Sequence, residues 1–121
     1  MNKECIYKLK NFYRAITSFE ADLQRKVGLN INETMLLCLI SEKGSITSGE
    51  IADEMELTHS NASKVIAALE KKSLIKRRTC KEDKRCMIFG ITKKGDELLA
   101  ILNCEQLQMP ECLKFIASDN M

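Results

Sequence analysis

One stretch of the sequence, residues 58–95, constrains the fold more than any other, because three kinds of segment follow one another in it. Thr58 can cap a helix that runs from His59 to about residue 72, since its hydroxyl can accept backbone N–H groups that are unpaired in the first turn. Two segments with strand character, residues 75–80 and 86–91, come next and enclose polar residues 81–85. The sequence therefore predicts a helix followed by a β-hairpin with a polar tip.

A short helix is predicted immediately before this block. Thr47 and Glu50 have the spacing of a capping box, which starts a helix, and Leu57 and Thr58 form the turn that follows it. Two helices joined by so tight a turn make a helix-turn-helix, and the hairpin downstream supplies a wing. We therefore predict a winged helix-turn-helix with these inward-facing residues on its two helices: Ile51, Ala52, Met55, Ala62, Ile66 and Leu69.

The composition favours helices in the rest of the chain. Its 121 residues include only five Gly and one Pro, which permits long helices and disfavours a turn-rich sandwich or barrel. Apolar residues recur at helical spacing over residues 3–26, and a capping-box pattern at Asn30 and Glu33 opens a second helix that Gly44 ends, with Leu36, Leu39 and Ile40 inward. Thr92 can cap a helix to about residue 107, before a short helix over 111–117. The predicted fold class is mainly α with a small β-hairpin wing.

These elements predict three regions. An N-terminal helix occupies residues 1–28, a winged helix-turn-helix DNA-binding domain occupies residues 29–95, and C-terminal helices occupy residues 96–121. The outer two regions contain more apolar surface than a winged core of about 65 residues can cover. Burial across a two-fold axis would remove this exposed patch, so we expect the outer regions to form the interface of a homodimer.

The charges are distributed unevenly along the chain. Residues 64–94 carry 11 Lys and Arg against 3 acidic residues, a net charge of +8, whereas residues 1–63 carry 7 against 9 and residues 95–121 carry 1 against 5. The net charge of +2 for the whole chain therefore conceals a basic segment on a mildly acidic body. Such a segment is typical of a protein that binds a polyanion, and the partner that we expect is double-stranded DNA.

The outward face of the helix that starts at His59 has small, amide and basic side chains. An α-helix fits the major groove, where Asn61 can offer a donor and an acceptor to an adenine and Lys64 can reach a phosphate or a guanine. Taken alone, a first helical turn with these side chains is typical of ordinary exposed surface. The basic hairpin that follows it in the sequence favours DNA binding instead. The predicted major-groove residues are His59, Ser60, Asn61, Ser63 and Lys64.

The hairpin supplies a candidate for the minor groove. Arg85 at its tip can enter this narrow groove, and Asp83 can orient the Arg85 guanidinium and so support the wing. The alternative is a solvated turn whose surface ion pair contributes about 0–1 kcal/mol. The remaining basic residues of the hairpin are predicted to contact flanking phosphates: Arg77, Arg78, Lys81 and Lys84.

Short motifs in this region resemble those of the MarR family of bacterial transcription regulators. Residues 69–78 resemble the family's Leu-Glu-x-x-Gly-Leu-Ile-x-Arg stretch, Asp83-x-Arg85 its wing, and Ile91-Thr92-x-x-Gly95 the Leu-Thr-x-x-Gly that opens its next helix. The resemblance implies a homodimer that binds a pseudo-palindromic operator. It also implies a repressor, usually one released by a small-molecule inducer or by thiol oxidation.

The chain departs from the family pattern at two points. Ser73 stands where the family favours Gly, so a left-handed helix cap would carry a Cβ at a cost of up to about 1 kcal/mol. Only 26 residues follow Gly95, fewer than the family commonly uses for its dimerisation helices. We therefore expect a dimer interface that is small or unusually arranged.

Six cysteines and one histidine bear on redox and metal chemistry. Because the chain has no signal sequence, we expect the cysteines to be buried thiols in the reduced state. No Cys-x-x-Cys pair occurs, so we predict neither a metal nor another cofactor. Cys80 and Cys86 would lie close together at the base of the hairpin among cations that favour a reactive thiolate. Cys5 lies in the region where some MarR family members sense peroxides. A thiol-based redox-sensing regulator of the same fold is therefore an alternative.

Other classes of function fit less well. With His59 as its single histidine, the chain has no Ser-His-Asp or Cys-His set, and it has no Gly-rich phosphate loop, so we predict no catalytic residues and no enzyme. A winged helix that binds only proteins, without DNA binding, stays open as an alternative. The charged N-terminus lacks a signal-peptide core and no apolar run approaches the ~20 residues of a membrane span, so we expect a cytoplasmic protein without membrane association.

Overall fold

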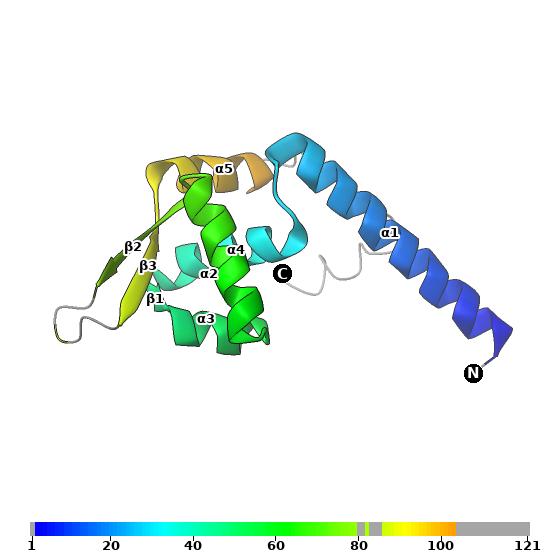
Figure 1. Cartoon of the computed structure of the whole chain (residues 1–121). Coiled ribbons are helices and arrows are strands. Elements are labelled where there is room, and N and C mark those ends of the chain that lie inside the picture. The colour runs from blue at the N-terminus through cyan, green and yellow to red at the C-terminus, as the bar shows by residue number, and fades with distance from the viewer. Residues whose placement is uncertain (1, 80–81, 83–85, 104–121) are drawn as a thin grey trace. The chain divides into compact units, whose positions relative to one another are not determined.

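The computed structural model describes residues 2–79, 82 and 86–103, and these residues form five helices and a small sheet (Figure 1). The elements are, in order, α1 (Lys3–Val27), α2 (Ile31–Lys43), β1 (Ile46–Thr47), α3 (Ser48–Met55), α4 (His59–Lys71), β2 (Ile75–Thr79), β3 (Met87–Ile91) and α5 (Lys93–Asn103). Two compact units are present: one contains α1 and extends to Asn30, and the other begins at Ile31 and contains the other described elements. The predicted fold class is confirmed.

The helix α1 belongs to the first unit and matches the helix predicted over residues 3–26. Asn2 caps its start, because the Asn2 side-chain oxygen accepts a hydrogen bond of 2.9 Å from the backbone N–H of Cys5. Gly28 ends it in the left-handed conformation, with a φ of 73°. α1 exposes 44–71% of the surface of five large apolar residues: Ile6, Tyr7, Leu9, Tyr13 and Ile16. No helix within the described residues is long and apolar enough to cross a membrane.

The helices α2, α3 and α4 pack with the sheet around the apolar core of the second unit (Figure 1). In α2, Leu37 is fully buried and Leu39 only half-buried, whereas the sequence pattern predicted Leu39 as a core residue. The apolar residues of α2 are distributed around most of the helix, so their spacing alone does not show which face is buried. On α3 and α4 the predicted inward residues are confirmed as buried: Ile51, Ala52, Met55, Ala62, Ile66 and Leu69.

The sheet has three antiparallel strands in the order β1-β3-β2. Its strands β2 and β3 form the predicted hairpin, in which Lys76 lies opposite Gly90 and Arg77 lies opposite Phe89. The strand β1 pairs with β3 through Ile46 and Thr47. It is not apparent from the sequence, because two residues are too few to show an alternating pattern.

The helix α5 starts where the sequence predicts. The Thr92 hydroxyl accepts a hydrogen bond of 3.1 Å from the backbone N–H of Gly95, which caps the first turn. The structure describes α5 as far as Asn103. The predicted continuation to about residue 107 and the last helix over 111–117 lie outside the described residues.

Candidate nucleic-acid interface

The exposed face of α4 carries all five predicted major-groove residues. Ala62, Ile66 and Leu69 are buried in the core, which fixes the rotation of α4 about its own axis. As a result, the five predicted residues lie together at the start of the helix. All of them are exposed: His59, Ser60, Asn61, Ser63 and Lys64. Their contact with DNA stays a prediction.

The start of α4 is held by Thr58, as the sequence predicts. The Thr58 hydroxyl oxygen accepts a hydrogen bond of 3.1 Å from the backbone N–H of Asn61, and the Thr58 carbonyl accepts one of 2.9 Å from Ala62. Within the described residues the Asn61 side chain makes no hydrogen bond. Its amide donor and carbonyl acceptor are therefore both available for the edge of a base.

The turn from α3 to α4 depends on Glu56, which no sequence pattern singles out. Glu56 ends α3 in the left-handed conformation with a φ of 53°, which residues other than glycine seldom adopt. The backbone N–H of Leu57 then donates to the Ala52 carbonyl over 3.0 Å. At the other end of α3 the predicted capping box of Thr47 and Glu50 is confirmed. These two caps set the length of the helix that packs against α4.

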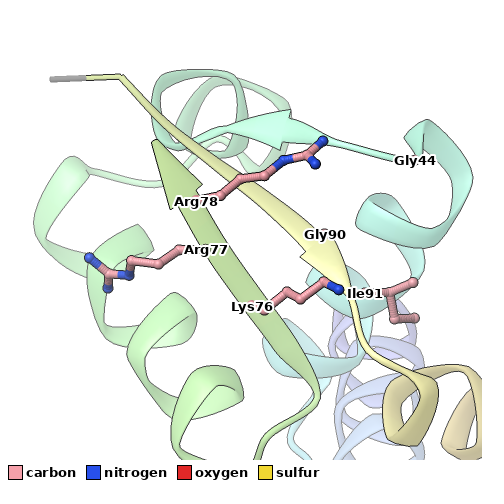
Figure 2. Close-up of a pocket in the computed structure, with 6 residues that line it drawn as sticks. All are labelled: Gly44, Lys76, Arg77, Arg78, Gly90 and Ile91. Carbon is pink, nitrogen blue, oxygen red and sulfur yellow. The ribbon is translucent and has the colours of Figure 1, made fainter. Parts of the chain in front are cut away.

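The basic residues of β2 are divided between the two faces of the sheet. Arg77 points towards α4, where its Nε donates to a Glu70 carboxylate oxygen over 2.6 Å and its Nη2 pairs with the other oxygen. Its guanidinium carbon lies 5.6 Å from the centre of the Phe89 ring, in a cation–π contact. Lys76 and Arg78 point to the other side, because successive side chains in a strand alternate (Figure 2). The side chains of Arg77 and Arg78 therefore lie on opposite faces of the sheet, and their phosphate contacts stay predictions.

The ion pair of Glu70 and Arg77 joins the end of α4 to the stalk of the wing. The hydrogen bond from Arg77 holds the pKa of the Glu70 carboxyl below its ordinary value, and the same bond raises the pKa of Arg77. Both groups are therefore charged at neutral pH. The sequence pattern predicts only a DNA contact for Arg77, since its pairing with Glu70 depends on the path of the chain after α4.

The base of the wing is joined to the end of α4. Ser73 has a φ of 63°, which confirms the predicted left-handed position with a Cβ. The Thr92 hydroxyl donates to the Ser73 carbonyl over 2.7 Å, and the Thr92 backbone N–H donates to the Leu74 carbonyl over 3.1 Å. A Cβ at Gly95 would lie 2.4 Å from the Leu74 carbonyl oxygen and 2.6 Å from Ile91 Cγ1. Close packing against Leu74 and Ile91 therefore explains why the motif ends in glycine at position 95.

A second ion pair attaches the end of α4 to α2. Glu33 is 4% exposed, and one of its carboxylate oxygens accepts a hydrogen bond of 2.8 Å from Lys72 Nζ. Lys94 Nζ in turn donates to the Lys72 carbonyl over 3.0 Å. The sequence pattern gave Glu33 only a local role at the start of α2, because a partner 39 residues away leaves no local signal.

Several predicted residues of the hairpin lie outside the described residues. Their roles in minor-groove binding, phosphate contact and redox chemistry stay predictions. They are the minor-groove candidate Arg85, its support Asp83, the phosphate contacts Lys81 and Lys84, and Cys80.

The described cysteines differ from the expectation of reduced, buried thiols. Cys5 and Cys38 are free but exposed. Partial burial and the charge of Glu42 raise the pKa of the Cys38 thiol, which disfavours its reactive thiolate. Cys86 is half-buried and disulfide-bonded. Among the residues that the structure describes, no group of three His, Cys, Asp or Glu side chains is placed to hold a metal ion.

Comparison with known proteins gives matches over the same region. A model of the MarR family matches residues 29–87. The chain is 36% identical over 73 residues to the transcriptional repressor MprA of Escherichia coli (strain K12), a match that covers 57% of this chain and 42% of MprA. It is 34% identical over 93 residues to the HTH-type transcriptional regulator YxaD of Bacillus subtilis (strain 168), covering 77% of this chain and 65% of YxaD. Each match spans less than two thirds of the relative.

A solved structure extends the similarity to most of the chain. It is the crystal structure of Sco3205, a MarR family transcriptional regulator from Streptomyces coelicolor, in complex with DNA. The two chains are 25% identical, with a TM-score of 0.70, and the similarity covers 98% of this chain and 87% of Sco3205. The similarity therefore extends beyond the residues that the family model matches.

Proposed function

Because this chain belongs to the MarR family of winged helix-turn-helix transcription regulators, we propose that it binds a specific double-stranded DNA sequence and represses transcription. The family consists of regulators rather than enzymes, so the chain is not an enzyme. The observation that carries the proposal is the exposed face of α4, on which the side chains from His59 to Lys64 are presented by a helix with a buried opposite face. A rigid helix of this kind is what base readout in the major groove requires.

The wing complements α4 in this proposal. Arg85, oriented by Asp83, enters the minor groove, and Lys81 and Lys84 contact phosphates on either side. Phosphate contacts position the protein, whereas Asn61 and its neighbours on α4 specify the sequence. The names of two relatives support this function, since MprA is a transcriptional repressor and Sco3205 was crystallised with DNA.

A homodimer is the assembly that we propose for DNA binding. The exposed apolar residues of α1, together with Ile101 on α5, which is 45% exposed, would be covered in such an interface. Two copies of α4 held ~34–36 Å apart would meet successive major grooves on one face of the duplex. The operator is then pseudo-palindromic, and a small-molecule inducer would release it by changing this spacing.

Selection from random duplexes, followed by fluorescence anisotropy, tests the proposal. Asn61→Ala should cost about 1–3 kcal/mol on the selected sequence and much less on random DNA, because the lost contact is one to a base. Asn32→Ala is the matched control, since Asn32 is an exposed asparagine on α2. It should change neither affinity.

Two other results would contradict the proposal. An equal loss on both sequences would make Asn61 a phosphate contact, and a selection without an enriched sequence would remove the DNA function. Measuring affinity at two salt concentrations distinguishes DNA binding from a winged helix that binds only proteins, because phosphate contacts make affinity fall steeply with salt.

Redox control is a second candidate, favoured by the disulfide at Cys86. Cys86 directly precedes β3 at the base of the wing, so a change between thiol and disulfide at this point would act on the hairpin. DNA affinity measured with and without dithiothreitol tests this regulation, with Cys86→Ser as the variant that should lose the response. An unchanged response in Cys86→Ser would exclude Cys86 as the sensor.

A further inference from the structure

The outer face of the hairpin, opposite the face that contacts α4, carries two cations. Arg77 marks the side of β2 that faces α4, because it pairs with Glu70. Lys76 and Arg78 therefore belong to the opposite side, where they lie across from Gly90 and Ile88 of β3. Figure 2 shows Arg78 reaching over β3 towards the segment that carries Gly44 and Lys76 reaching over β3 towards Ile91, while Arg77 points away from them.

A small pocket lies beneath these two cations. It has a volume of about 190 Å³ and is lined by Gly44, Lys76, Arg77, Arg78, Gly90 and Ile91. Two of the lining residues are glycines: a Cβ added at Gly90 would lie 3.9 Å from the Gly44 carbonyl oxygen, an ordinary van der Waals contact, and one added at Gly44 would meet nothing within 4 Å. Pockets for drug-sized ligands have volumes of roughly 300–1,000 Å³, so this one suits a smaller molecule.

Two of the three cations at the pocket, Lys76 and Arg78, have no acidic partner in the part of the chain that the structure describes. Within the described residues neither Lys76 nor Arg78 forms an ion pair, whereas Arg77 is neutralised by Glu70. An arginine fork can bind two oxygens of a carboxylate or phosphate at once, and a lysine beside it adds a second positive charge. Ile91, an apolar residue, also lines the pocket.

We propose that this pocket is a binding site for a small anion with a phosphate or carboxylate group, held between Lys76 and Arg78. A free anion is favoured over the DNA backbone because the pocket opens on the side of the sheet opposite α4. The pocket joins Gly44, which precedes β1, to the two strands that carry the wing. If the proposed function holds, an anion bound here would restrain the wing relative to α3 and so modulate DNA affinity.

Nuclear magnetic resonance titration of the full ¹⁵N-labelled chain tests the site without DNA. Sodium phosphate and sodium acetate are the two probes, each added at constant ionic strength. We expect saturable shifts of the Gly44 and Gly90 amide signals with at least one probe. Lys76→Gln combined with Arg78→Gln should weaken this binding by at least about tenfold, since it removes two charge-assisted contacts.

The matched control is Lys71→Gln combined with Lys93→Gln, which removes two positive charges from exposed positions outside the pocket. It should leave the shifts and their midpoint unchanged. Shifts that rise linearly without saturation, or that respond equally to both double variants, would overturn the proposal.

DNA binding by the same proteins separates this proposal from the proposed function. If Lys76→Gln with Arg78→Gln loses about tenfold in DNA affinity and neither probe saturates, the two residues contact the DNA backbone and the anion site is refuted. If a probe saturates but the wild type binds no DNA, the anion site stands and the proposed function fails.

Discussion

Replacing Gly95 with Ala tests the close contact that joins α5 to the wing. The added Cβ would lie 2.4 Å from the Leu74 carbonyl oxygen and 2.6 Å from Ile91 Cγ1. The Ile91 side chain can rotate away, but the Leu74 carbonyl belongs to the backbone and accepts the N–H of Thr92. Overpacking costs about 1–3 kcal/mol and a weakened hydrogen bond about 1 kcal/mol, while the higher helix propensity of Ala offsets up to about 1 kcal/mol. We therefore expect the free energy of unfolding to fall by about 1–3 kcal/mol.

Urea unfolding followed by circular dichroism measures this loss, and Gly49→Ala is its control. Gly49 lies in α3, and nothing is within 4 Å of a Cβ added there. The same substitution at Gly49 should leave stability unchanged or raise it by up to about 1 kcal/mol. A Gly95→Ala protein as stable as the wild type would refute the reasoning, and so would an equal loss in both variants.

Three further substitutions test the other contacts of the fold. Glu70→Gln removes a partly exposed ion pair with Arg77, so stability at pH 7 should fall by less than about 1 kcal/mol. Arg77 lowers the pKa of the Glu70 carboxyl in the folded state, so the ion pair contributes its full stability above the ordinary pKa of 4.5. This contribution is lost as the pH falls through the lower pKa of the folded state. The urea midpoint of Glu70→Gln should lack this pH dependence. Glu33→Gln removes a buried carboxylate and should cost about 1–3 kcal/mol by urea unfolding, whereas Glu42→Gln, exposed on the same helix, should cost almost nothing. Ile101→Asp should convert the proposed dimer to a monomer in light scattering with an unchanged circular dichroism spectrum, and a persistent dimer would exclude Ile101 from the interface.

Elements with local signals could be predicted from the sequence. The capping oxygen of Thr58, the spacing of the buried residues of α4 and the left-handed position of Ser73 each depend on a few neighbouring residues. The same is true of the hairpin, whose polar tip separates two short segments of strand character. For this reason the face of α4 that carries Asn61 is where the sequence placed it.

Features that depend on long-range packing could not be predicted. The pairs Glu70–Arg77 and Glu33–Lys72 form only after α4 has packed beside the sheet and α2. The strand β1 exists because β3 offers it an edge, and its own two residues carry no strand pattern. The left-handed Glu56 is likewise imposed by the turn between α3 and α4, since its side chain gives no preference for that conformation.

The claim that a dimer reads DNA through α4 is tested most directly by one titration of the wild type. Fluorescence anisotropy with the selected operator and with a scrambled duplex of equal length gives both specificity and stoichiometry. We predict two chains per operator and a preference for it of at least about 10³-fold over the scrambled duplex. Equal affinity for the two duplexes, or a single chain per operator, would contradict the claim.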